Sequence, residues 1–293
     1  MDYQELRSII KKESKKEDFK NSSDYLETII YNLDIKNLIP IITEIGSIPE
    51  DVGHDSSEEK LYAKVSDIVL AKCFRELGLK ASVNKERSNC ADVTAKSCFH
   101  NYSLVGDAKS FRLSRTAKNQ KDFKVKSMAH WKYDNDYAVL VCPYYQYPKS
   151  KSQIYGQALD DNITLFTWEY LSILLDNNVC EDDQINISSF WNISRRLSGK
   201  TEHINRNRCF LDDQDEIIKL FLNISTAQFN IFLKSYKRNI ITRGENEIKY
   251  WENIKTEINS YTKEQAIEEL LKTLKLNEKI NTIKKYINSL KDG

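Results

Sequence analysis

The spacing of apolar residues changes along the chain. Over residues 1–50 these residues recur every three or four positions, which predicts short helices. A longer helix is expected from about Ser57, and Gly78 follows its apolar stripe in the place that glycine commonly takes after a helix C-terminus. Shorter apolar or alternating runs after that glycine predict strands.

The expected strands cover residues 81–83, 91–95, 103–109, 137–142 and 163–166. Segments with helical spacing, 114–131 and 150–159, separate the last three of these strands, and another such segment begins at residue 168. Strands that alternate with helices imply an α/β fold, here a mixed central sheet flanked by helices. From residue 187 onward only helical spacing remains. We therefore predict three parts: an N-terminal helical segment (1–55), a core (56–186) and a C-terminal helical region (187–293).

The amino-acid composition excludes fewer classes of function than the pattern of apolar and polar residues does. The formal net charge of the 293-residue chain is +1, so any nucleic-acid surface must be a local concentration of positive side chains. Six cysteines without a CxxC pair and four isolated histidines predict neither a zinc site nor a disulfide framework. With no visible signal peptide and no apolar run of roughly 20 residues, a cytoplasmic protein outside the membrane is expected.

Two acids and a lysine stand at the ends of two expected strands. Because alternate side chains of a strand share a face, Asp107 and Lys109 should point the same way, and Asp92 reaches that face if the two strands pair. Carboxylates suit Mg²⁺, and the strand-end carbonyl of Ala108 is a plausible further ligand. Such a set serves metal-assisted phosphodiester hydrolysis. Lys109 is either a base for the attacking water or, as we prefer, an orienting and charge-stabilising group. Lys96, four residues after Asp92, is the alternative candidate for the lysine of this site.

The alternative interpretation of Asp107 and Lys109 is an ion pair on an edge strand, which contributes little to stability. Against this, the run Leu104-Val105-Gly106 predicts a mostly buried strand, where a charged pair needs a metal or partner to offset desolvation.

Basic residues recur at every third position after this strand. Lysine and arginine contacts to phosphate give affinity, whereas Asn119 can pair with adenine and Asp122 with cytosine. An ordinary exposed helix is the alternative. The candidate DNA-binding residues are Arg112, Arg115, Lys118, Asn119, Lys121, Asp122 and Lys124.

The spacing Asp92-x(14)-Asp107-x-Lys109 resembles the PD-(D/E)xK nuclease signature, with Ala91 in place of the usual proline and aspartate as the second acid. The block 107–126, together with 59–61, 67–72 and 136–140, closely resembles the HindIII family of type II restriction endonucleases. The resemblance implies a nuclease-type core, and a Mg²⁺-dependent homodimer that cuts double-stranded DNA at AAGCTT between the adenines, leaving 5′-phosphate ends. It also implies a cognate methyltransferase that makes no direct contact.

The resemblance gives Glu59 a second interpretation, as an accessory acid beside the metal site. The other is a capping-box glutamate, because Ser56-x-x-Glu59 has that spacing. Two rival functions also remain at this stage. One is a structure-selective repair or recombination nuclease, and the other is a DNA-binding protein without catalysis.

Overall fold

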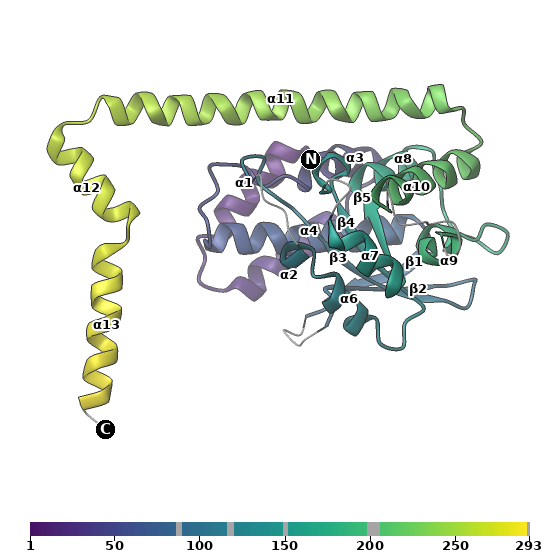
Figure 1. Cartoon of the computed structure of the whole chain (residues 1–293), viewed down its shortest axis with the longest axis horizontal. Coiled ribbons are helices and arrows are strands. Elements are labelled where there is room, and N and C mark those ends of the chain that lie inside the picture. The colour runs from purple at the N-terminus through teal and green to yellow at the C-terminus, as the bar shows by residue number, and fades with distance from the viewer. Residues whose placement is uncertain (86–89, 116–119, 149–151, 198–205, 292–293) are drawn as a thin grey trace. The chain divides into compact units, whose positions relative to one another are not determined.

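The computed structural model describes residues 1–85, 90–115, 120–148, 152–197 and 206–291 (Figure 1). By their internal contacts the residues divide into two units, a large unit (Met1–Thr242) and a C-terminal unit (Arg243–Gly293). The division falls within the long helix α11 (Thr226–Asn259). The three-part division at residues 55 and 186 stays a prediction.

A five-stranded mixed sheet forms the centre of the large unit. Its strands lie in chain order: β1 (Leu79–Val83), β2 (Val93–Ser97), β3 (Ser103–Ala108), β4 (Tyr137–Cys142) and β5 (Ile163–Thr167). The first three are antiparallel neighbours, while β3, β4 and β5 run parallel. The predicted α/β class with a mixed sheet is therefore confirmed. In this register Asp107 lies opposite Leu140, near the carboxyl ends of the parallel strands.

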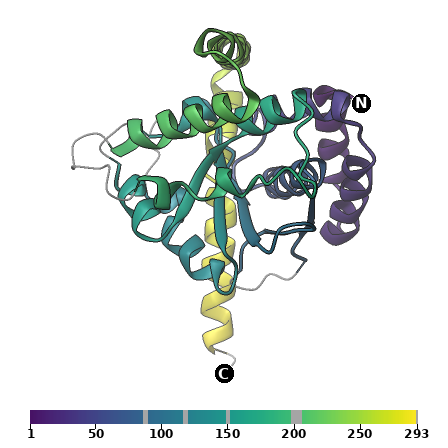
Figure 2. The same cartoon turned by 90° about the vertical axis from the view of Figure 1, so that its right-hand side faces the viewer.

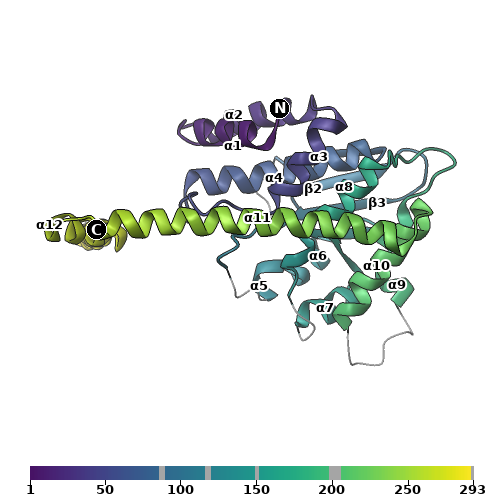
Figure 3. The same ribbon diagram turned by 90° about the horizontal axis from the view of Figure 1, so that it is seen from above.

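Helices cover both faces of the sheet (Figures 2 and 3). Alternate residues of β4 show the two sides: Val139 and Val141 belong to one apolar core, and Ala138, Leu140 and Cys142 to the other. The first core is closed by α1 (Tyr3–Glu13), α2 (Phe19–Tyr31), α3 (Ile35–Ile45), α4 (Ser57–Glu76) and α8 (Trp168–Asp176). The second is closed by α5 (Gln120–Phe123), α6 (Val125–Lys132), α7 (Gln153–Asp160) and α9 (Ile193–Leu197). Helix α10 (Arg206–Leu222) contributes Phe210 to the second core and Ile218 to the first.

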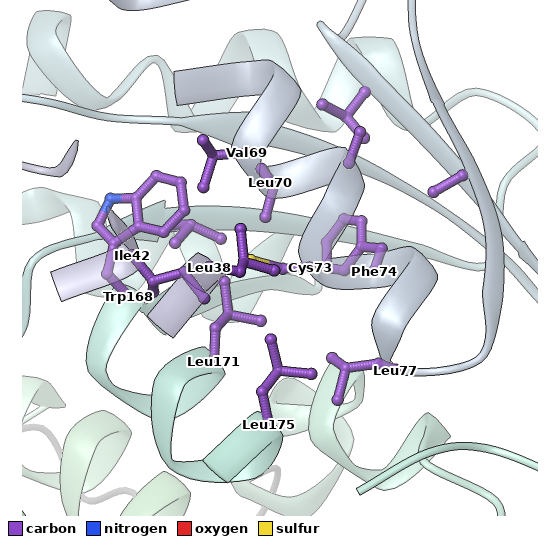
Figure 4. Close-up of a cluster of buried hydrophobic side chains, with 14 of the residues drawn as sticks. Leu38, Ile42, Val69, Leu70, Cys73, Phe74, Leu77, Trp168, Leu171 and Leu175 are labelled. Atoms are coloured by element: carbon purple, nitrogen blue, oxygen red, sulfur yellow. The ribbon is translucent and has the colours of Figure 1, made fainter. Parts of the chain in front are cut away.

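Helix α4 is buried over most of its length, which fixes its position relative to the sheet. Its apolar side chains meet those of α3 and α8 in the cluster drawn in Figure 4, where Leu70, Phe74, Trp168 and Leu171 are labelled. Gly78, the residue after the helix cap, has φ +90°, and a Cβ there would come within 2.6 Å of the Glu181 carbonyl oxygen. Glycine is thus required where the predicted helix ends.

The predicted single helix over 114–131 is wrong. Residues 113–115 are not helical, α5 begins only at Gln120, and Lys124 interrupts the helix with φ 51°. Tertiary contacts explain the first difference, because the backbone N–H and the hydroxyl of Ser114 donate to the two carboxylate oxygens of Glu50, at 2.9 and 2.8 Å. The bonds to this buried acid outweigh the local helical preference.

The C-terminal unit holds the end of α11, α12 (Lys263–Thr273) and α13 (Leu276–Lys291). Helix α12 begins with a capping box, for which Thr262-x-x-Gln265 has the usual spacing. The Thr262 hydroxyl accepts from the Gln265 N–H at 3.2 Å, and the Gln265 side chain accepts from the Thr262 N–H at 2.8 Å. Among the described residues, no helix combines the length and apolarity needed to cross a bilayer.

Candidate metal centre

Three aspartates from three elements converge beside the end of β3. Asp67 comes from α4, Asp92 immediately precedes β2, and Asp107 lies in β3; one carboxylate oxygen from each lies within 4.8 Å of the others. The Lys109 ammonium donates to Oδ2 of Asp107 at 2.5 Å. The two acids and the lysine singled out by their strand positions therefore lie together, with a third acid beside them.

Asp67 is a site residue that the sequence pattern did not single out. It is 7% exposed, and its Oδ1 lies 3.4 Å from the N–H of Ala108, which points the carboxylate at the end of β3. One signal could have revealed it. Asp67 is a lone acid beside the apolar run from Ile68 to Ala71, where a buried charge requires a compensating partner.

The cluster is electrostatically unfavourable without a cation. Burial and the charges of Asp92 and Asp107 raise the pKa of Asp67 well above its usual value. Burial and then the Asp107 charge raise the pKa of Asp92, while Lys64 and Lys109 oppose the rise. A divalent cation would stabilise all three ionised carboxylates. The oxygen-only donor set suits a hard cation such as Mg²⁺.

A cavity of about 940 Å³ opens next to the cluster, and Asp67 and Asp92 line it. The other lining comes from α2, α4 and the end of β1, and includes Lys20, Lys60, Lys64 and Lys85. The Lys64 ammonium donates to the Asn84 carbonyl at 3.0 Å, while Lys85 pairs with Asp24 at 3.0 Å. The acids thus open onto a space whose wall can contact an anionic substrate.

Glu59 lies apart from the three-aspartate cluster. Its N–H donates to the Ser56 hydroxyl at 3.1 Å, as predicted for a cap, but its carboxylate accepts from the N–H of Asp55 at 2.7 Å and pairs with Arg112. Glu59 groups with His54 and Asp55, so the α4 acid that joins the cluster is Asp67.

The predicted DNA-binding residues that the structure describes lie in different surroundings. The Arg112 guanidinium donates to Glu59 and to the Val52 carbonyl, and Arg115 pairs with Asp122. Lys121 and Lys124 are exposed, the latter at the break between α5 and α6. Lys118 and Asn119 lie outside the described residues.

A mixed sheet with clustered aspartates and a lysine at a strand end is the arrangement typical of metal-dependent phosphodiester nucleases. Comparison with known proteins is more specific. The family model of the HindIII restriction endonuclease matches residues 8–287. The chain is also 41% identical over 290 residues to the type II restriction enzyme HindIII of Haemophilus influenzae, covering 99% of this chain and 96% of that protein. The chain therefore belongs to the HindIII restriction endonuclease family, and it is a type II restriction enzyme, a site-specific deoxyribonuclease.

Proposed function

We propose that this enzyme is a homodimer that cuts double-stranded DNA at AAGCTT between the two adenines, using Mg²⁺, in the cytoplasm. Each cut leaves a 5′-phosphate and a 3′-hydroxyl. The observation that carries the proposal is the meeting of Asp67, Asp92 and Asp107 beside Lys109, in a chain of the HindIII family. The recognition sequence and the position of the cut rest on the resemblance.

The residues divide the work by their chemistry. Asp92 and Asp107, with the Ala108 carbonyl and Asp67, would hold Mg²⁺, which supplies an activated water and neutralises charge on the scissile phosphate. The Lys109 side chain donates to Oδ2 of Asp107 at 2.5 Å, which holds it beside the carboxylates. From this position Lys109 would orient the attacking water and stabilise the charge of the transition state.

DNA contacts would come from two places. Arg115, Lys118, Lys121 and Lys124 would hold phosphates, while Asn119 and Asp122 read bases. Arg112 is held by Glu59 and Val52, so it positions this segment. The lysines of the cavity beside Asp67 and Asp92 would hold the backbone near the scissile phosphate.

A palindromic site implies a two-fold protein. Each subunit reads one half-site and cuts one strand, so two copies must bind together to make a double-strand cut. Protection of the host DNA would fall to a methyltransferase of the same system, which modifies the same sequence without contacting this enzyme.

The test is cleavage of two plasmids, one carrying a single AAGCTT and one with that sequence altered by one base pair. We expect Mg²⁺-dependent linear product from the first plasmid alone, no product in EDTA, and sequenced ends that place the cut between the adenines. Asp107→Asn should abolish cleavage and retain DNA binding.

Three outcomes would contradict the proposal. Discrete cuts at another sequence would overturn the recognition site, and cutting of branched DNA alone would indicate a repair nuclease. Binding without any cleavage would indicate a DNA-binding protein.

A further inference from the structure

The C-terminal unit carries its large apolar side chains on the outside. No residue in 243–285 is buried, and nine isoleucines and leucines of the unit are 36–59% exposed. They are Ile248, Ile258, Ile267, Leu270, Leu271, Leu274, Leu276, Ile280 and Ile283. Elsewhere in the described chain only eight large hydrophobic side chains are comparably exposed, spread from Tyr25 to Ile241. Such a concentration marks an interaction surface.

The exposed residues lie on helix faces. On α12, Ile267, Leu270, Leu271 and Leu274 follow the spacing i, i+3, i+4, i+7, which places them on one stripe. On α13, Leu276, Ile280 and Ile283 follow i, i+4, i+7. A one-sided stripe of this kind is normally covered by another helix.

The charges of the unit indicate what covers these stripes. Residues 243–271 carry seven carboxylates and four cations, whereas residues 272–291 carry six cations and one carboxylate. The first half is therefore acidic and the second half basic. Two copies placed antiparallel would set the acidic half of each against the basic half of the other.

We propose that the C-terminal unit is a dimerisation arm, in which the apolar stripes of α12 and α13 pack antiparallel against those of a second copy. A two-fold interface uses the same surface of both copies, so that surface must be complementary to itself. The acidic half followed by the basic half meets this requirement when the two copies are antiparallel. A stable interface takes about 800 Å² from each partner. The seven aliphatic side chains of the α12 and α13 stripes, each 36–59% exposed, would form the apolar centre of such an interface. The inference rests on the proposed function only for the expectation that the active enzyme is dimeric.

The first test is the mass of the full chain by light scattering during gel filtration. Wild type should elute at twice the 34.2 kDa of the chain, and Leu270→Gln combined with Leu274→Gln should give the monomer mass. Thr273→Gln, which lies between these residues but off the stripe, is the matched control and should stay dimeric. A monomeric wild type, or a double variant that stays dimeric, would refute the arm.

Charge exchange provides a second test that does not depend on removing apolar groups. Glu264→Lys with Glu268→Lys should weaken the dimer, and so should Lys279→Glu with Lys284→Glu. All four changes in one chain should restore it, because antiparallel copies then again face opposite charges. Failure of restoration, as expected if the stripes fold onto their own large unit or if α13 binds DNA, overturns the proposal.

The outcomes for the arm and for the nuclease are separable. Plasmid cleavage by the wild type tests the enzyme, whereas the masses test only the arm. If the enzyme cleaves site-specifically and its dimer persists after the Leu270 and Leu274 changes, the proposed function holds. The same result rejects the α12 and α13 stripes as the dimer interface.

Discussion

A carboxylate oxygen of Asp67, on α4, lies within 4.8 Å of one of Asp107, in β3. The two residues are far apart in sequence, and the buried packing of α4 against the sheet brings them together. Burial and the charges of Asp92 and Asp107 raise the pKa of Asp67, and a bound cation would favour its ionised form.

Asp67→Asn should weaken the divalent metal site. We expect roughly 10–100-fold lower Mg²⁺ affinity, the usual loss when a group that supports a metal site is removed. Cleavage rates measured against Mg²⁺ concentration give the shift, and titration with Mn²⁺ by calorimetry gives an independent affinity.

The matched control is Glu58→Gln, which alters a carboxylate of the same helix outside the three-aspartate group. Its Mg²⁺ dependence should equal that of the wild type. If Asp67→Asn also behaves as wild type, Asp67 has no part in metal binding.

Lys64→Ala should weaken binding of DNA more than it slows the chemical step. Lys64 lines the cavity beside Asp67 and Asp92, where its charge can meet a phosphate of the bound strand. A lost phosphate contact costs affinity irrespective of sequence and lowers the salt dependence of binding by about one counterion. Fluorescence anisotropy of a duplex at several salt concentrations measures both effects.

Lys64→Arg should retain most of the affinity, since it keeps the charge. Lys80→Ala, at an exposed position of β1, serves as the control. A salt slope that is unchanged in Lys64→Ala would assign Lys64 to the hydrogen bond with Asn84 alone.

Local spacing predicted most of the sheet. The strand over 137–142 has the predicted bounds because six consecutive residues are apolar or aromatic. The strand that carries Asp107 ends at Ala108, one residue earlier than expected. Alternation along this strand correctly placed Asp107 and Lys109 on one side. The bounds of a strand and the side on which its residues lie depend on residues close in sequence, so they can be predicted from the pattern.

Contacts between distant segments were not predictable in this way. Asp67 joins the cluster only because α4 packs on the sheet, and its spacing alone does not distinguish it from an exposed helical acid. Residues 111–115 stand next to a segment with helical spacing, but tertiary hydrogen bonds hold them in another conformation. Phe111 donates its N–H to the Gly46 carbonyl at 3.1 Å, and Ser114 donates to Glu50. The identity of those partners is a property of the tertiary fold.

The buried Glu169 should make the large unit less stable as pH rises. Burial raises its pKa from 4.5 to about 7, although its carboxylate accepts from the Tyr144 N–H at 2.8 Å. The folded state therefore holds a proton that the unfolded chain releases, so this contribution to the free energy of unfolding falls between pH 4.5 and about 7. At about 1.4 kcal/mol per pKa unit, the whole effect is on the order of 3 kcal/mol.

Glu169→Gln keeps an acceptor for the Tyr144 N–H and removes the ionisation. Its stability advantage over the wild type, from urea unfolding, should be larger at pH 8 than at pH 5. Asp183→Asn, at an exposed carboxylate, should show no such trend. An advantage that is equal at both pH values would mean that Glu169 does not titrate in this range.

Gly46 sets the close approach of α3 to the segment that carries Lys109. A Cβ at this position would lie 2.5 Å from Cγ of Pro143 and 2.6 Å from Cδ1 of Trp168, while the Gly46 carbonyl accepts from the Phe111 N–H. Both obstructing groups are rigid rings, and Trp168 is almost fully buried. Gly46→Ala should therefore lower the free energy of unfolding by about 1–3 kcal/mol, the usual cost of overpacking.

Gly53→Ala is the matched control for this change. A Cβ at Gly53 would meet only the side chain of Ser56, at 3.4 Å or more, which is ordinary contact. Thermal unfolding should show a lower midpoint for Gly46→Ala and a midpoint close to wild type for Gly53→Ala. Equal midpoints in both variants would show that the ring of Pro143 and the indole of Trp168 can move apart, so that the approach of α3 is adjustable and Gly46 is not needed for it.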